Sequence, residues 1–453
     1  MRRHSILTRL GPTDRARIRT RDRDSVRTEI PFVDGERRLG YGLGQMVDQL
    51  AARSLQPTNP ALDLALLAAT VTAADTRISR ATESQDSWTR EIDLYLPVEN
   101  PDLWQGESAL IERILNFLTG DRWRLFFRPR HCDYRQLIHP SRELVRPRFD
   151  CVSLFSGGLD SFVGAIDLLA SGRNPIFVSH YWDASTSSQR RCAQRLGNVY
   201  GDLAPRYVRA YVGFSDDLIQ DSEPEKTTRG RSFLFFALAT LAASGLDTET
   251  PVYVPENGLI SLNIPLDPLR VGAWSTRTTH PFYMARWAEL TQQLGLAVTW
   301  ENPYRFSTKG EMLSACANRR LLRRNLAETI SCSSISKARW KGLSPGHCGH
   351  CVPCLIRRGA IASAFRNDPT LYTIANLAAQ PLDSKRAEGQ DIRSFQMMAK
   401  RLLQRPELAD VLVRKSGPLS GYTQEEIADY AAVFARGIAE VGATVNSVVV
   451  RPL

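Results

Sequence analysis

The chain has 453 residues, of which 43% are hydrophobic and 23% charged, and a formal net charge of +10. This length is enough for two or three domains, each with its own core, and the composition is ordinary for a soluble globular protein. No apolar run reaches the roughly 18 residues of a membrane span, so we expect no membrane contact. The positive charge suits a phosphorylated ligand, an acidic protein or nucleic acid as partner.

Residues 1–148 are expected to form an accessory α+β region without chemistry of its own. The first residues are rich in arginine but lack the apolar segment of a signal peptide, so we interpret them as a mobile basic leader or a partner-contacting arm. Hydrophobic periodicity predicts helices over 60–79 and 106–119 and strands over 92–96 and 123–127. His131, Cys132 and His139 are metal-binding residue types, but their spacing matches no metal pattern and favours surface or minor-core roles.

The stretch from Cys151 to Phe162 predicts a strand, a glycine turn and the N-terminus of a helix, in that order. Such a turn can bind an anion, because the helix end presents unpaired N–H groups and glycines let the backbone approach a phosphate. Ser156 and Ser161 add hydroxyl donors, and Asp160 can hold a magnesium ion or orient the loop. We expect Ser156 and Asp160 to be exposed at this loop. The alternative is an ordinary strand-to-helix turn.

Strand and helix patterns alternate over residues 149–370, which is typical of an α/β domain with a doubly wound parallel sheet. Further strands are predicted over 175–181, 207–214, 251–255 and 297–300, and helices over 187–203, 229–243 and 281–294. A capping box at Thr308 opens the next helix. Ligands of such sheets bind beyond the carboxyl ends of the strands, so the loops at Ser156, His180, Glu256 and Asn302 should converge.

Four cysteines are spaced as metal ligands, three of them at two-residue gaps and one 16 positions upstream. Short Cys-x2-Cys knuckles let two thiolates face one ion, and four thiolates with no open position describe a structural zinc site. The four cysteines are Cys332, Cys348, Cys351 and Cys354. An iron–sulfur cluster or unliganded buried thiols are the alternatives, and His347 and His350 are possible substitute ligands. Clustered cysteines of this kind are expected in a reducing cytoplasm.

Residues 371–453 are expected to be helical, with one helix over 391–404. A second capping box, Thr423 to Glu426, opens an amphipathic helix that runs to Gly442. We interpret this region as a packing or partner-docking element.

The motif Ser-Gly-Gly-x-Asp-Ser, from Ser156 to Ser161, resembles the PP-loop of the ATP pyrophosphatases, which cleave ATP between the α- and β-phosphates and adenylate a substrate. Together with Ser331-Cys332, the cysteine knuckles and Arg357, it makes residues 150–365 similar to the 7-cyano-7-deazaguanine synthases (QueC-like). The resemblance implies the adenine nucleotide alpha hydrolase-like fold. The extra N- and C-terminal regions resemble those of larger QueC-like proteins from anti-phage defence cassettes of the Qat type.

Carried over by position, the resemblance implies roles for individual residues. Arg231 would lie near the nucleotide, and Lys309 would face the departing pyrophosphate. We also expect His180, from the loop at the end of its strand, to bind the nucleotide. The loop that binds the deazapurine in the family is replaced here, and we expect Glu256, Asn257, Arg277 and His280 to contact the substrate. The phosphate loop itself would consist of Ser156, Gly157, Gly158, Leu159, Asp160 and Ser161.

The resemblance implies a cytoplasmic, AMP-forming ligase that uses ATP, Mg²⁺ and a structural Zn²⁺ to adenylate a 7-deazaguanine carboxylic acid. Among defence-cassette proteins, it implies transfer of the acid to an amine, such as the N-terminus of a protein partner from the same cassette. Three alternatives stay open: an ordinary synthase that uses ammonia, a PP-loop tRNA sulfurtransferase with Cys192 or Cys316 as reactive thiol, and a nucleotide-sensing scaffold without turnover.

Overall fold

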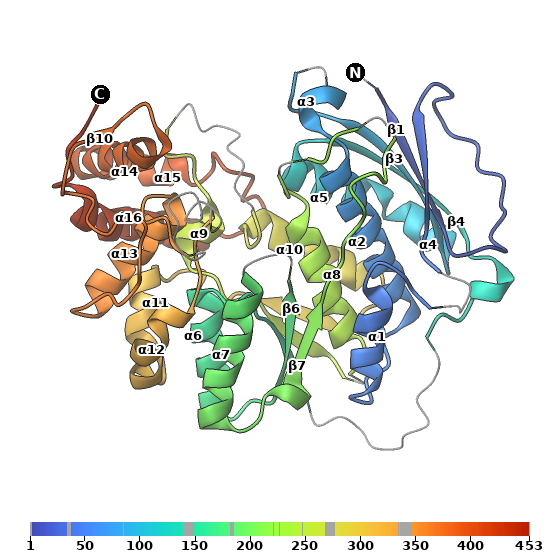
Figure 1. The fold of residues 1–453 in the computed structure, drawn as a ribbon, viewed down its shortest axis with the longest axis horizontal. Coiled ribbons are helices and arrows are strands. Elements are labelled where there is room, and N and C mark those ends of the chain that lie inside the picture. The colour runs from blue at the N-terminus through green and yellow to red at the C-terminus, as the bar shows by residue number, and fades with distance from the viewer. Residues whose placement is uncertain are drawn as a thin grey trace.

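The computed structural model places the central sheet between two flanking regions (Figure 1). The N-terminal sheet and its helices lie on one side, and the C-terminal helices lie on the other. The predicted candidate His139 falls outside the described residues. The structure describes residues 2–33, 38–84, 86–138, 149–181, 185–220, 222–225, 227–246, 248–267, 277–333, 335 and 346–452.

The central sheet has five strands, all parallel, in the order β7-β6-β5-β8-β9. It confirms the predicted parallel α/β sheet. Its direction of winding reverses at β5, so the carboxyl end of β5 lies at the switch point where ligands bind in such sheets. The strands are β5 (Cys151–Leu154), β6 (Pro175–His180), β7 (Tyr207–Ala210), β8 (Thr250–Tyr253) and β9 (Val298–Glu301).

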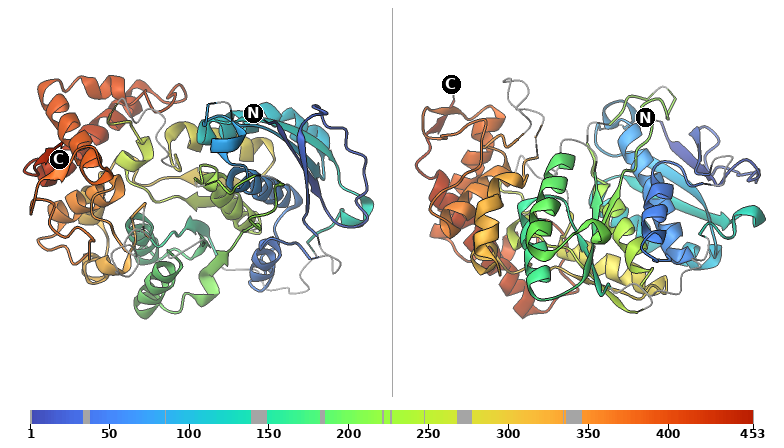
Figure 2. Two further views of the ribbon diagram at one scale, coloured as in Figure 1. Left: turned by 45° about the horizontal axis from the view of Figure 1, so that its top comes forward. Right: turned by 60° about the horizontal axis from the view of Figure 1, so that its bottom comes forward.

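Helices cover both faces of this sheet, as Figures 1 and 2 show from three directions. Alternate residues of β5 enter different cores: Val152 and Leu154 pack with α8 and α10, whereas Phe155, which follows the strand, packs with α6 and α7. This alternation is the period of two expected for a strand with two buried faces. The helices are α6 (Leu159–Ala170), α7 (Ser185–Tyr200), α8 (Arg231–Ala243) and α10 (Pro281–Gln293).

The N-terminal region contains a second parallel sheet of four strands, in the order β2-β1-β3-β4. Two of its strands match the prediction, and two were not predicted. The interpretation of the arginine-rich first residues as a mobile leader is wrong over 4–9, which form β1, and the unpredicted strand β2 follows at 26–31. The strands are β1 (His4–Arg9), β2 (Val26–Pro31), β3 (Glu91–Val98) and β4 (Arg122–Pro129).

β1 cannot be recognised from alternating hydrophobic residues, because polar side chains occupy most of its buried positions. His4, Ser5 and Thr8 are fully buried. Each has a hydrogen-bond partner: His4 with Glu83 at 3.1 Å, Ser5 with Ser25 at 2.7 Å and Thr8 with Thr70 at 3.1 Å. Buried polar groups are tolerated when they are paired in this way, so the strand needs few apolar residues.

One hydrophobic core runs from the N-terminal sheet into the central sheet. α2 (Asn59–Arg77) is almost entirely buried because it packs between the N-terminal sheet and α8. The two regions therefore share their interior, while the predicted boundary at residue 148 stays a prediction. The remaining elements of this part are α1 (Leu43–Ala51), α3 (Arg80–Glu83), α4 (Pro101–Gly106), α5 (Ser108–Thr119), and the short turns η1 (Cys132–Tyr134) and η2 (Ala204–Arg206).

Two arginines and two aspartates form a buried ion cluster between α2, β3 and α8. Arg90 contacts Asp75 at 2.9 Å and Asp121 at 2.6 Å, and Arg80 contacts the same carboxylates at 3.1 and 2.6 Å. All four side chains are at most 1% exposed. The second oxygen of Asp75 accepts a hydrogen bond of 2.7 Å from the N–H of Gly230, the residue before α8. The cluster thus fixes the start of α8.

The C-terminal region is helical as predicted, and it packs on the central domain through α16. The two capping boxes expected at Thr308 and Thr423 are both present. No helix among the described residues is both long and apolar enough to cross a membrane. The elements from α9 onward are α9 (Gly258–Leu262), α11 (Lys309–Ala315), α12 (Arg319–Asn325), η4 (Leu326–Glu328), α13 (Val352–Ala364), β10 (Leu382–Asp383), α14 (Ala387–Gln404), α15 (Leu408–Leu412), α16 (Gln424–Val445) and β11 (Val450–Arg451).

Candidate functional site

The glycine turn lies between the carboxyl end of β5 and the N-terminus of α6, as predicted. Gly157 has a φ of +75°, and a Cβ there would come within 2.8 Å of the backbone nitrogen of Gln189, so only glycine fits this position. The hydroxyl oxygens of Ser156 and Ser161 lie 3.1 Å apart, and Ser161 donates to the carbonyl of Gly158 at 3.0 Å. The turn therefore brings two hydroxyl groups to the positive end of a 12-residue helix.

Asp160 joins the turn to two other segments of the site. Its carboxylate contacts the Lys309 ammonium at 2.7 Å and accepts hydrogen bonds from the side chain and backbone N–H of Asn257, at 2.7 and 3.1 Å. The exposed fraction is 8% for Asp160 and 4% for Lys309. The expectation that Asp160 is exposed at the loop is therefore wrong, because this paired carboxylate lies beneath the turn. Ser156 is exposed, as expected.

The donor set around Asp160 does not fit a resident magnesium ion. Both of its oxygens already face Lys309 or Asn257. No group of three potential ligand side chains gathers there among the described residues. Of the two roles predicted for Asp160, the contacts favour orienting the loop.

A carboxylate from the C-terminal region holds the N-terminus of α11, which begins at Lys309. Glu440 of α16 accepts hydrogen bonds from the Thr308 hydroxyl at 2.7 Å and from the N–H of Gly310 at 3.0 Å. A negative group near a helix N-terminus is stabilised by the unpaired N–H groups and the helix dipole. The C-terminal region thus supports the position of Lys309.

One pocket, with a volume of about 190 Å³, opens beside the turn. It brings together residues from four loops and helices that are far apart in the sequence, including the predicted residues Ser156, Ser161, Arg231 and Glu256. Of the four loops expected to converge, those at Ser156 and Glu256 line the pocket. Asn302 contacts Glu256 but, like His180, does not line the pocket. The lining residues are Leu154, Ser156, Ser161, Arg231, Ser232, Phe235, Val254, Pro255, Glu256, Thr278 and Thr279.

Glu256 supplies a carboxyl group with an unusual protonation equilibrium to this pocket. Burial raises its pKa to about 7, and the negative charge of Asp160 acts in the same direction, while Thr279 and Lys309 act against the rise. The Thr279 hydroxyl donates to the Glu256 carboxylate, and Asn302 donates from its side-chain amide to the Glu256 carbonyl at 2.8 Å. Near neutral pH the pocket therefore holds a carboxyl that can both lose and accept a proton.

This raised pKa predicts a pH-dependent stability difference between wild type and the Glu256→Gln variant. The folded state binds the proton more tightly than the unfolded state, whose ordinary value is 4.5. The stabilisation is therefore complete below about pH 4.5 and is lost as pH rises through about 7. Chemical denaturation should find the variant gaining stability over wild type between these values, by up to about 3 kcal/mol. Glu301→Gln, at an exposed position, is the control. If the free energy of unfolding changed with pH in the same way in all three proteins, the prediction would be contradicted.

Nine of the predicted catalytic, nucleotide-binding and substrate residues do not line the pocket. They are Gly157, Gly158, Leu159 and Asp160 of the turn, Lys309 and Asn257, which contact Asp160, and His180, Arg277 and His280. Burial, and to a smaller extent Arg231, lowers the pKa of His180 to about 3, and its side chain is enclosed at the end of β6. Arg277 lies over the ring of Phe117, with its guanidinium 4.6 Å from the ring centroid. His280 is fully buried and caps α10, where it accepts a hydrogen bond of 3.1 Å from the N–H of Phe282.

Other pocket residues were missed at the sequence level. Thr278 and Thr279 come from the segment that contains Arg277 and His280, and they, not their charged neighbours, face the pocket. Phe235 follows Arg231 by four positions on α8 and so lies on the same side of the helix. Ser232 is the next residue after Arg231 and lies about 100° further around the helix axis. The helical spacing from Arg231 was the only signal that could have found Phe235.

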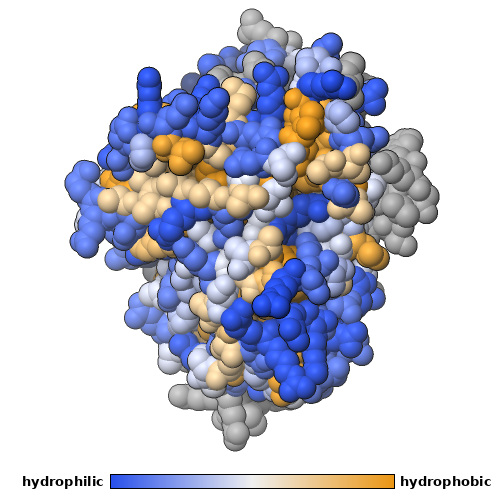
Figure 3. Space-filling view, turned by 90° about the vertical axis from the view of Figure 1, so that its left-hand side faces the viewer, coloured by the Kyte–Doolittle hydropathy of each residue, from blue (hydrophilic) through white to orange (hydrophobic). Residues whose placement is uncertain are grey.

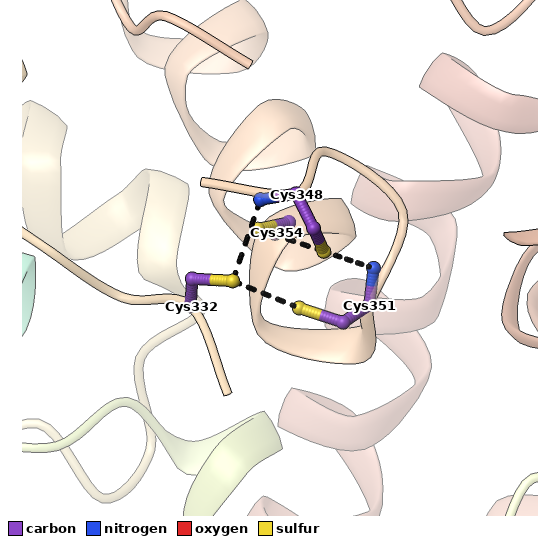
Figure 4. Close-up of side chains that lie close together, drawn as sticks. All are labelled: Cys332, Cys348, Cys351 and Cys354. Carbon is purple, nitrogen blue, oxygen red and sulfur yellow. Dashed lines mark hydrogen bonds between the residues drawn. The ribbon is translucent and has the colours of Figure 1, made fainter. Parts of the chain in front are cut away.

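The four predicted cysteines come together as a buried group, drawn in Figure 4. Their sulfur atoms all lie within 4.8 Å of one another, with 3.8 Å between Cys332 and Cys351 and 3.9 Å between Cys348 and Cys354. Four thiolates in tetrahedral contact with zinc at about 2.3 Å stand about 3.8 Å apart. The group can therefore hold a metal ion such as zinc, and its spacing favours one ion over an iron–sulfur cluster, which spreads its thiolates around several irons.

The cysteine group is connected to the glycine turn by the short segment before Cys332. The N–H of Ile330 donates to the Gly157 carbonyl at 3.0 Å, and the N–H of Ser331 donates to the His347 ring at 3.1 Å. Arg357, fully buried on α13, donates to the Leu326 carbonyl at 2.6 Å. A metal bound by the cysteines would therefore hold the segment that supports the turn.

Replacing Cys351 with serine is expected to lower the bound metal and the stability together. The substitution leaves three thiolates, and the free energy of metal binding is part of the free energy of folding at such a site. Elemental analysis of the purified protein should find zinc in wild type and a several-fold lower content in the variant, with a lower melting temperature. Cys132→Ser, which removes an exposed thiol, should change neither; equal metal content in all three proteins would contradict the prediction.

No protein-family model matches the chain, and no curated protein matches its sequence significantly.

Proposed function

We propose that the protein is an ATP-dependent, AMP-forming ligase that activates a carboxylic acid beside the glycine turn. The observation that carries this proposal is the convergence of two hydroxyls, Arg231 and Glu256 around one pocket at a helix N-terminus. The Lys309–Asp160 pair lies beneath the turn that forms one side of this pocket. Groups of this kind stabilise the charge of phosphates in the transition state of phosphoryl transfer. The resemblance of the turn to the PP-loop indicates cleavage between the α- and β-phosphates.

The reaction would proceed in two steps. A carboxylate oxygen of the substrate attacks the α-phosphorus of ATP, so an acyl adenylate forms and pyrophosphate leaves. An amine then attacks the acyl carbon, the bond from that carbon to the AMP oxygen breaks, and the amine proton passes to a base. Lys309 would neutralise the departing pyrophosphate, and Glu256 can accept the proton because its pKa lies near 7.

The resemblance to the 7-cyano-7-deazaguanine synthases suggests a 7-deazaguanine carboxylic acid as substrate. We further propose that the acceptor is the N-terminus of a protein partner in anti-phage defence, as the likeness to the Qat-type proteins suggests. ATP would bind with Mg²⁺ on its phosphates, and Zn²⁺ would occupy the cysteine group. Glu256, which lines the pocket, supports the substrate-binding role proposed for the segment after β8. Asn257 is fully buried and holds Asp160 instead.

Of the alternatives, sulfur transfer has the least support. It needs a reactive cysteine near the adenylate, and thiolates are the reactive form. Cys192 is fully buried and Cys316 is 4% exposed, and burial raises the pKa of each thiol to about 12. Neither lines the pocket.

Mass spectrometry of the products distinguishes the proposed acceptors. The protein is incubated with ATP, Mg²⁺ and the deazaguanine acid, with ammonia, small amines or a co-expressed partner as acceptor. A partner whose intact mass increases by one acyl group supports the proposal. Mass spectrometry of its proteolytic peptides should then locate the addition at its N-terminus. A free nitrile with an unmodified partner would instead support the ordinary synthase reaction.

A further inference from the structure

The loop between β1 and β2 carries an arginine at every second position over residues 15–23, here called the arginine segment. All of its arginines are exposed, whereas Ile18, Thr20 and Asp22 between them are half-buried. This alternation is that of an extended chain with one face outward, in which successive outward residues stand about 6.8 Å apart. The arginines are Arg15, Arg17, Arg19, Arg21 and Arg23.

The arginine segment is held on the outer face of the N-terminal sheet, away from α2 (Figure 1). The N–H of Arg21 donates to the Tyr95 hydroxyl of β3 at 2.7 Å, and Arg9 of β1 donates to the carbonyl of Ala16 at 2.6 Å. Asp22 pairs with Arg3 at 2.9 Å. Because the backbone is already positioned, binding of a ligand to these arginines would not lose affinity to the entropy of ordering the chain.

The charges of the arginine segment are not neutralised, in contrast to those of the sheet beneath it. Two arginines of the sheet that face this side have a carboxylate: Arg3, just before β1, pairs with Glu91, and Arg124 of β4 pairs with Asp93, both at 2.6 Å. Within the described parts of the chain, no carboxylate forms an ion pair with the side chains of the segment's five arginines. The segment therefore concentrates positive charge on one face of the molecule.

This face also lacks the apolar anchors on which protein partners usually depend. Among the described residues, no large exposed apolar side chain belongs to the N-terminal sheet or its loop. Most belong to the C-terminal region. Figure 3 draws the side on which that region lies, and the apolar residues visible there are interspersed among hydrophilic ones. The exposed large apolar residues are Val199, Tyr211, Leu371, Met397, Leu403, Val411 and Val449.

We propose that the arginine segment binds the phosphate backbone of a nucleic acid. A guanidinium can donate two parallel hydrogen bonds to a phosphate, and arginine is favoured over lysine where such contacts are made. A row of cations without apolar anchors matches a polymer that carries a charge on every unit. Because phosphate contacts carry no sequence information, binding should be independent of sequence and should weaken steeply with salt.

Fluorescence anisotropy with the full-length protein tests this proposal. The probes are labelled DNA strands of about 20 nucleotides, single and double, since a bound site covers a comparable length. Wild type should bind at about 50 mM salt and lose affinity as salt rises. The triple variant Arg17→Gln, Arg19→Gln, Arg21→Gln should bind at least tenfold more weakly, with a salt slope shallower by about one per lost contact.

The matched control is the triple variant Arg320→Gln, Arg323→Gln, Arg324→Gln on α12, which removes the same charge from other exposed arginines. It should retain the affinity and salt slope of wild type. Equal weakening of both variants would overturn the proposal, since the effect would then follow net charge alone. It would also be overturned if a labelled polyglutamate peptide or phosphatidylserine vesicles bind the segment as tightly as DNA does.

Discussion

Replacing Lys309 with alanine is expected to slow pyrophosphate release from ATP by about 100- to 1,000-fold, the usual effect of removing one donor that stabilises transition-state charge. Lys309 is the cation aligned by Asp160 beneath the turn, at 2.7 Å. Ser156→Ala should slow the same step with little loss of stability, because Ser156 is exposed. Asp160→Ala should slow it and also destabilise the protein, because it leaves a buried lysine without its partner. Pyrophosphate release and thermal unfolding measure the two effects.

Two substitutions of the same chemistry serve as controls for this prediction. Ser171→Ala removes an exposed hydroxyl just beyond the far end of α6, and Lys400→Ala removes an exposed ammonium from α14. Both should release pyrophosphate at the wild-type rate. If Lys309→Ala and Ser156→Ala did so as well, the turn would be an ordinary strand-to-helix connection.

Replacing Arg90 with methionine is expected to lower the free energy of unfolding by about 3–5 kcal/mol. Arg90 is fully buried and faces Asp75 and Asp121. Without it, two carboxylates in the interior share one guanidinium, that of Arg80. Because Asp75 also accepts from the N–H of Gly230, the start of α8 should loosen, and the position of Arg231 with it. Urea denaturation gives the change in free energy.

An ion pair with an exposed arginine on the same sheet is the control. Arg122 of β4 contacts Glu91 at 3.3 Å with 74% of its side chain exposed, and such pairs contribute about 0–1 kcal/mol. Arg122→Met should therefore unfold at nearly the wild-type urea concentration. Similar losses for the two variants would mean that the buried ion cluster does not stabilise the fold. If Arg90→Met does not fold, Arg90→Lys can be measured instead, because it keeps the positive charge but not the planar guanidinium with its several N–H donors. Arg90→Lys should still lose more free energy of unfolding than Arg122→Met.

The features that were predicted correctly are those encoded in adjacent residues. The turn at Gly157 needs its strand, its glycines and its helix within a dozen positions, so its geometry follows from the local sequence. The capping boxes at Thr308 and Thr423 and the Cys-x2-Cys knuckles are local for the same reason. The parallel sheet was predicted from the alternation of strands and helices, because the spacing of hydrophobic residues differs between the two kinds of element.

The features that were missed depend on contacts between distant segments. β1 could not be found from its apolar pattern, because its buried polar side chains are acceptable only when partners such as Glu83 and Thr70 are in place. The burial of Asp160 depends on Lys309, about 150 positions away along the chain. Arg277 and Thr278 are neighbours in sequence, and only the packing of Arg277 on Phe117 decides which of the two faces the pocket.

The most direct test of the proposed ligase is the fate of ATP in the presence of Mg²⁺ and a 7-deazaguanine carboxylic acid. The account predicts that AMP and pyrophosphate form in equal amounts, that the acid is required, and that Lys309→Ala forms both products about 100- to 1,000-fold more slowly while remaining folded. Formation of ADP and phosphate, or ATP that stays intact with every acid offered, would contradict it.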